Sequence, residues 1–211
     1  MGKDDHLDPE QGYVTEADLY VNFLLHAIFG KLSEADAIVR FGGDQIRAVA
    51  DQLTSKLPFE PKPLHRGLLL DPTESYRALD QLTFLSWSED RRVAEWFACP
   101  RSAVSEPLMK HNPKLRGHII QIPAPRSRVL FHHSWARMFD GLATIALGHP
   151  FMGEEGQRQI EWSLRTQREV ITEPVEDLSP QAASELDSTA LANLERRLSP
   201  PWIIAKEGIR S

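Results

Sequence analysis

The sequence of 211 residues has a single cysteine, Cys99, so it cannot form an internal disulfide, which fits a reducing compartment. Long apolar runs are also missing: the most apolar stretches, such as residues 142–147, are far too short to span a bilayer. No N-terminal stretch combines a basic flank, an apolar core and a small-residue cleavage site, so Sec export is not indicated. We therefore expect a cytoplasmic protein without a membrane partner.

An excess of positive charge is absent as well. The formal net charge is −6 and the pI is about 5.8, so the chain has no general attraction to nucleic acid, although a local basic patch stays compatible with these values. The glycines form neither a P-loop nor a dinucleotide-binding fingerprint. His132 and His133 are adjacent, so on a strand they would face opposite ways. With one cysteine and no His/Cys cluster, we predict no metal site.

The residues that are present favour a folded domain. The hydrophobic fraction is 41% and there are five tryptophans, which argues against intrinsic disorder. Residues 1–14 read as a flexible arm. Residues 15–57 read as an N-terminal helical layer of three helices, in which Gly42-Gly43 supplies a left-handed C-cap and a break between Ser33 and Lys56.

Residues 64–205 show short strand patterns interspersed with helices. We expect strands at 64–70, 82–86, 117–122, 127–131 and 169–172, and a short one near 202–205. We expect helices at 88–98, 134–147 and 179–198, a loop at 100–114 and a turn-rich connection at 148–156. Helices followed by many short strands predict an α+β fold, with the whole chain forming one compact domain.

Three short motifs carry candidate chemistry. The first is His65-Arg66-Gly67, in which a guanidinium on a strand can fork onto phosphate oxygens and the glycine leaves room for a dinucleotide. Alternatively, Arg66 is a strand-edge arginine paired to a surface acid. The second is Ser86-Trp87-Ser88, preceded by Phe84, in which Ser88 is equally suited to cap the following helix.

The third motif is Gln167-Arg168-Glu169. If the backbone is extended here, residues 167 and 169 point to the same face and Arg168 points away. A glutamate held at a strand start can stabilise positive charge that develops at an anomeric carbon, as carboxylates do in glycosidases. The alternative is that Glu169 is a surface charge on an edge strand.

The order of these motifs resembles that of mono-ADP-ribosyltransferases of the Arg–Ser–Glu type with a Gln-x-Glu motif, over roughly residues 64–174. The resemblance implies a split β-sandwich core and NAD⁺ as a consumed co-substrate without a metal. It also implies that Glu169 is the catalytic carboxylate, that Ser86 hydrogen-bonds it, and that Gln167 acts beside it. The implied NAD-binding residues are His65, Arg66, Gly67, Ser86, Ser88, Phe97 and Arg101. Trp87 departs from the family, which has threonine at that position.

The resemblance also bears on the acceptor of ADP-ribose. Gln-x-Glu, in place of Glu-x-Glu, implies a non-arginine acceptor on a protein or a nucleic acid, and the acidic pI leans slightly towards protein. The acceptor loop would be residues 161–166, with Trp162 either an aromatic platform or a core residue. Such an enzyme fits a toxin or injected effector, with an antitoxin or immunity partner. A NAD glycohydrolase and a non-catalytic binding module remain alternatives.

Overall fold

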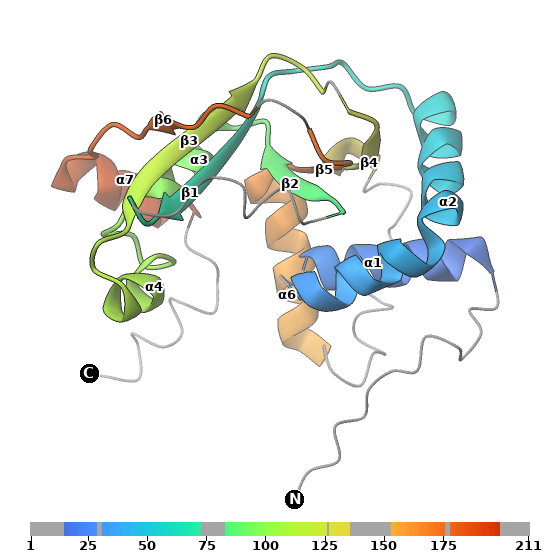
Figure 1. Ribbon diagram of the computed structural model, residues 1–211, viewed down its shortest axis with the longest axis horizontal. Helices are drawn as coiled ribbons and strands as arrows, with labels where there is room; N and C mark the ends of the chain where they lie inside the picture. Colours follow the sequence, from blue (N-terminus) through green and yellow to red (C-terminus); the bar gives the residue numbers. More distant parts are fainter. Residues whose placement is uncertain are drawn as a thin grey trace, which may run out of the picture.

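The computed structural model describes residues 15–28, 31–72, 83–125, 127–135, 153–175 and 178–198 (Figure 1). Four expectations fall wholly or mostly outside these ranges: the arm at 1–14, the helix at 134–147, the turn-rich start at 148–152 and the strand near 202–205.

Two helices precede the sheet: α1 spans Glu16–Ile28 and α2 spans Leu32–Lys56. The expected break is present as a kink at Gly42, where the backbone leaves helical geometry and two helical segments of α2 meet. The expected left-handed C-cap is wrong, because Gly42 has a φ of −128° and a ψ of 32°. Figure 1 shows α2 turning sharply along its length. A Cβ at Gly42 would overlap the Leu19 side chain, so this glycine permits α1 and α2 to cross closely.

Within the described residues, six strands form one sheet in the order β4-β5-β2-β1-β3-β6, and every neighbouring pair is antiparallel. The strands are β1 (Leu64–Leu70), β2 (Leu85–Ser88), β3 (Arg116–Ile122), β4 (Val129–His132), β5 (Glu169–Thr172) and β6 (Gln181–Ala182). Helices and an antiparallel sheet together confirm the α+β class.

The sheet is weakly joined in its middle. β1 pairs with β3 along its whole length, from Leu64↔Ile122 to Leu70↔Arg116, and all of β2 pairs with β5. Between β1 and β2 the register contains a single residue pair, His65↔Ser88. The sheet therefore consists of two blocks, β1-β3-β6 and β2-β5-β4, that meet at one point (Figure 1).

The remaining helices of the described residues are α3 (Arg91–Ala98), α4 (Glu106–His111), α6 (Gly153–Trp162) and α7 (Ser188–Leu198), and a π-helical turn, Ser163–Gln167, follows α6. Glycines bring α3 close to the sheet. A Cβ at Gly67 would overlap the carbonyl oxygen of Ala94, and a Cβ at Gly117 would overlap that of Ala98. Gly67 therefore serves helix-to-strand packing, whereas the sequence had suggested room for a dinucleotide.

Several expected boundaries are wrong for local reasons. β2 extends to Ser88, and α3 begins at Arg91 because Asp90 accepts a hydrogen bond from Arg92 N at 2.9 Å and acts as N-cap. The expected loop at 100–114 contains α4, and the end of the expected turn at 148–156 belongs to α6. The last helix starts at Ser188, because residues 181–182 pair with β3 instead.

The helical layer and the sheet share one core. Buried side chains of α1 and α2 pack with those of the sheet, and Phe23 meets Phe84 edge-on with ring centroids 5.3 Å apart. A second cluster, formed by Val93, Trp96, Trp162, Leu194 and Leu198, joins α3, α6 and α7. Among the described residues, no helix has the length and apolar character needed to cross a membrane.

Candidate functional site

A cavity of about 380 Å³ lies at the junction of the two sheet blocks. Its walls come from α1, α2, β1, β2, α3, α6 and β5. The candidate residues that line it are His65, Arg66, Gly67, Ser86, Ser88, Phe97, Trp162, Gln167 and Glu169. Its volume lies in the range of about 300–1,000 Å³ that is typical of small-molecule sites. Residues from all three sequence motifs therefore surround one cavity.

Glu169, at the start of β5, is 4% exposed. Its Oε1 accepts a hydrogen bond from Ser86 Oγ at 2.6 Å, whereas Oε2 is buried and has no partner of normal geometry among the described residues. Burial raises the pKa of the Glu169 carboxyl, while the hydroxyls of Ser86 and Ser163 and the charge of Arg66 act in the opposite direction. One carboxylate oxygen is thus held by Ser86, and the other is buried without a hydrogen-bond partner among the described residues.

Arg66 connects the two sheet blocks. Its guanidinium, on β1, donates from Nη1 to the backbone oxygen of Ser86 on β2 at 2.8 Å. β1 and β2 share only one residue pair, so the Arg66 side chain adds a further link between these two strands. The preceding residue, His65, is buried, and burial lowers the pKa of its imidazole, which favours the neutral ring. Arg66 therefore supplies positive charge at a cavity that also contains Glu169.

The backbone of the Gln-x-Glu motif is not extended, so the expectation that strand alternation places residues 167 and 169 on one face is wrong. Gln167 ends the π-helical turn, and Arg168 adopts a left-handed conformation with φ 50° and ψ 55°. Both Gln167 and Glu169 nevertheless line the cavity. The Gln167 side-chain oxygen accepts a hydrogen bond from Ser163 Oγ at 3.2 Å.

Ser88 links the second and third motifs. Its Oγ donates to the backbone oxygen of Gln167 at 2.5 Å and accepts from the backbone N–H of Asp90 at 2.9 Å. The expectation that Ser88 caps the helix is wrong, because Asp90 holds that position. Ser88 instead anchors the turn that presents Glu169.

Trp87 occupies the middle position of the Ser-x-Ser motif and lies in the core. It is 3% exposed, and its indole Nε1 donates to Thr172 Oγ1 at 3.0 Å. Because side chains alternate along a strand, the burial of Trp87 turns Ser86 and Ser88 to the opposite face of β2.

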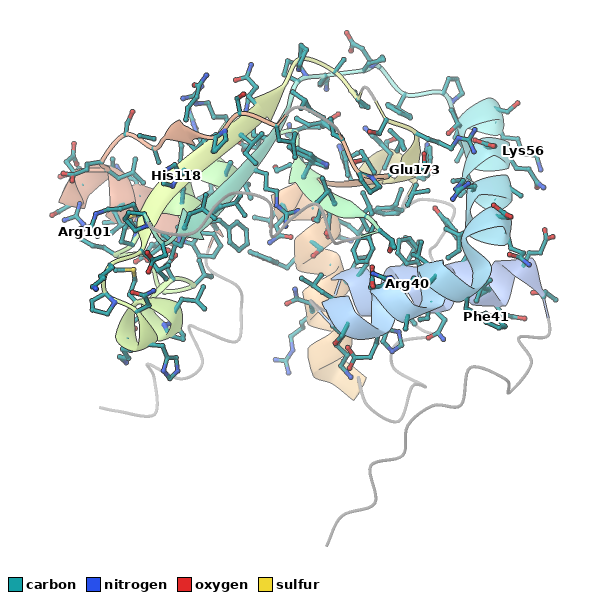
Figure 2. All side chains as sticks on the ribbon, viewed as in Figure 1. Arg40, Phe41, Lys56, Arg101, His118 and Glu173 are labelled. Carbon is teal, nitrogen blue, oxygen red and sulfur yellow. The ribbon has the colours of Figure 1, made fainter. Side chains whose placement is uncertain are left out.

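Phe97 and Trp162 line the cavity, and Arg101 does not. Trp162 is mainly a core residue: it is 7% exposed, stacks edge-on against Trp96 at 6.0 Å and donates from Nε1 to Leu198 O at 2.8 Å. The exposed Arg101 side chain donates from Nη2 to the Leu186 carbonyl and lies beside α7 at the edge of the molecule (Figure 2).

Sequence reasoning missed the wall made by the N-terminal helices and α6. Ala27 and Ile28 at the end of α1, Leu32 at the start of α2, and Gln159 on α6 all line the cavity. Their place in the cavity wall depends on how the helices pack on the sheet, and no local sequence pattern predicts it. Ser163 was also missed: its spacing of four residues from Gln167 becomes meaningful only if the segment is helical, and we expected a loop there.

A second polar cluster forms where β2 and β4 end. His132 Nε2 lies 3.1 Å from Glu89 Oε1, and His133 Nε2 lies 3.0 Å from Glu89 Oε2. The expectation that the two histidines face opposite ways is wrong, because β4 ends at His132 and the chain turns there, so that the rings stack with centroids 4.6 Å apart. Burial opposes ionisation of Glu89, yet hydrogen bonds from His133 and His132 hold the pKa of Glu89 below its ordinary value. Burial lowers the pKa of His132.

No protein-family model, curated protein or solved structure matches this chain.

Proposed function

We propose that the protein is a NAD⁺-dependent mono-ADP-ribosyltransferase that uses the cavity at the β1/β2 junction. The observation that carries the proposal is the Glu169 carboxylate, with Oε1 held by Ser86 at 2.6 Å and Oε2 buried beside the cavity without a hydrogen-bond partner of normal geometry among the described residues. The pairing of a fixed carboxylate with the Arg66 charge suits a substrate that contains phosphates and develops positive charge.

The near-division of the sheet supports a finer proposal about the fold. We propose that the two blocks, joined at His65↔Ser88, correspond to the split β-sandwich of the ADP-ribosyltransferases. The proposed substrate would lie across the gap, with its phosphates at Arg66. The apolar side chains of Ile28, Val93 and Phe97 would cover its ring systems.

Each polar residue has a separate task in the reaction. NAD⁺ supplies a C–N bond that breaks between nicotinamide and ribose, and nicotinamide leaves with the electron pair. Glu169 stabilises the positive charge that develops at the ribose carbon, and its Oε2 accepts a hydrogen bond from a ribose hydroxyl. Ser86 keeps the carboxylate in one rotamer. The acceptor forms the new bond to that carbon and releases its proton to solvent.

Gln167 would orient the acceptor. Its amide offers both a donor and an acceptor and cannot remove a proton from a guanidinium, which favours an amide, hydroxyl or base over arginine. Ser163 restrains its side-chain oxygen at 3.2 Å, so the amide has a defined direction at the cavity. We therefore keep a non-arginine acceptor on a protein or nucleic acid as the proposed target.

Incubation of the protein with a cell lysate and NAD⁺ labelled in its adenylate half tests this function. Transfer of label to polymer supports the transferase, and protease or nuclease treatment then identifies the acceptor class. Release of free ADP-ribose alone would replace it with a NAD glycohydrolase. Absence of any NAD⁺ loss overturns the enzymatic proposal.

The matched variants are Glu169→Gln and Glu185→Gln. Glu169→Gln keeps the size of the side chain and removes the charge, so NAD⁺ turnover should fall at least about 100-fold. Glu185 is exposed and does not line the cavity, so its variant should behave as the wild type. Normal turnover by Glu169→Gln would refute the site. Gln167→Ala should reduce transfer more than NAD⁺ hydrolysis, and an equal loss of both would remove Gln167 from the acceptor side.

A further inference from the structure

Outside the cavity, Glu89, His132 and His133 converge their ligand atoms at the ends of β2 and β4. Their three potential donor atoms all lie within 4.8 Å of one another. We propose that these residues form a binding site for one divalent transition-metal ion of the Zn²⁺ type. This proposal concerns a second site and does not depend on NAD⁺ chemistry.

To bind a metal ion, the three donor atoms need to move only a short distance towards one another. Zn²⁺ binds imidazole nitrogen at about 2.0–2.1 Å, so tetrahedral donors lie about 3.3 Å apart. His132 Nε2 is already 3.1 Å from Glu89 Oε1, and His133 Nε2 is 3.0 Å from Oε2. The most distant pair of donors would need to approach by at most about 1.5 Å. Rotation about side-chain torsions can supply this without moving the strands.

The donor set selects among metals. Two imidazole nitrogens and one carboxylate suit Zn²⁺, Co²⁺ or Ni²⁺, whereas Mg²⁺ and Ca²⁺ prefer oxygen ligands. In the metal-free cluster, each Nε2–H donates to Glu89. The metal would replace these two hydrogens, and each ring would carry its proton on Nδ1. His132 Nδ1 now accepts a hydrogen bond from the Ser134 backbone N–H at 3.1 Å, so this contact would have to lengthen when a metal binds. The proton on Nδ1 would then be donated to Ser134 Oγ, which lies 2.7 Å away.

The surroundings hold two of the ligands and leave one side open. The His132 ring stacks on Phe59 with centroids 4.2 Å apart and an interplanar angle of 16°. The side chains of His132 and Glu89 are 5% and 3% exposed, while His133 is 19% exposed. Entry and a fourth, solvent-derived ligand are therefore expected on the His133 side.

Lys62 is a positive charge in contact with the cluster, and it opposes the binding of a cation. Its Nζ lies 3.8 Å from Glu89 Oε2, and its side chain is 50% exposed, so it can turn into solvent when a metal binds. Removing this charge should strengthen metal binding.

Titration of the chelator-treated full-length protein with Zn²⁺ in a calorimeter, and with Co²⁺ under visible absorption, tests the site. We expect one Zn²⁺ per chain with micromolar or tighter affinity, a Co²⁺ spectrum of low coordination number, and no binding of Mg²⁺. His133→Ala should weaken Zn²⁺ binding at least about tenfold. Lys62→Gln should tighten it about two- to fivefold.

His111→Ala, at the exposed end of α4, is the matched control and should bind Zn²⁺ as the wild type does. Glu89→Gln tests the carboxylate, and circular dichroism establishes that each variant is folded. His133→Ala keeps the test valid even if the buried Glu89 variant fails to fold. Absence of stoichiometric Zn²⁺ binding to the wild type, or equal affinity in the wild type and His133→Ala, would overturn the proposal.

Discussion

Replacing Ser86 by alanine removes the hydrogen bond that holds Glu169 Oε1, and its effect on stability should depend on pH. A hydrogen bond to a charged group contributes about 1.5–3 kcal/mol. Because Glu169 is buried and Oε2 already lacks a partner of normal geometry among the described residues, the loss should fall near the upper part of that range when the carboxyl is ionised. For a domain of this size, the corresponding drop in Tm is about 2–4 °C per kcal/mol.

The sign of the pH dependence follows from burial. Burial raises the pKa of Glu169 in the folded protein, so the stability contributed by this group is fully present below its unfolded pKa and is lost as the pH rises through the folded pKa. Ser86→Ala raises the folded pKa of Glu169 further. The difference in Tm between wild type and Ser86→Ala should therefore widen as the pH rises.

Thermal unfolding between acidic and mildly alkaline pH measures this difference without reference to activity. Ser102→Ala is the matched control, because Ser102 is buried and its hydroxyl donates to the neutral Cys99 carbonyl at 2.9 Å. That variant should lose about 0.5–1.5 kcal/mol at every pH. If the Ser86→Ala difference is equally independent of pH, Ser86 does not hold an ionised Glu169 and our account of the carboxylate is refuted.

Two further predictions concern packing and binding. Gly67→Ala should destabilise the protein by about 1–3 kcal/mol or more, because its Cβ would overlap the Ala94 carbonyl, whereas Gly43→Ala, with no atom nearer than 3.6 Å, should be neutral or slightly stabilising. Chemical denaturation compares the two, and equal stability would mean that α3 does not approach β1 this closely. Arg101→Ala should change NAD⁺ affinity by less than about twofold, since Arg101 lies outside the cavity, whereas Arg66→Gln should weaken it at least about tenfold. Calorimetry measures both, and equal weakening would restore Arg101 as a NAD-binding residue.

Much of the fold could be predicted from local patterns. The apolar period of residues 64–70 matches β1, and the helical period of the N-terminal segment matches α1 and α2. Boundaries that depend on competing caps or on distant pairing could not be predicted. Asp90, and not Ser88, is the N-cap of α3, and residues 181–182 pair with β3 although we expected a helix there.

The candidate site could also be predicted only in part. The order of its motifs is visible in the sequence. The burial of Trp87 was not predicted, because we expected the strand to end at residue 86 and β2 extends to Ser88. The left-handed Arg168 is not visible, because a non-glycine residue takes that conformation only when surrounding contacts enforce it, here the hold of Ser88 on the Gln167 carbonyl. The convergence of His132 and His133 on Glu89 depends likewise on where β4 ends.

By itself, the sequence determined the α+β class, the helical start of the chain and the identity of the polar residues available for chemistry. These depend on periodicity and residue type, which are local properties. Only the tertiary structure decided that α1 and α2 form a wall of the cavity, that Gly67 serves α3, and that Ser86, Arg66 and Glu169 meet at the β1/β2 gap. Those outcomes come from contacts between residues far apart in the chain, which are selected by the burial of the shared core as a whole.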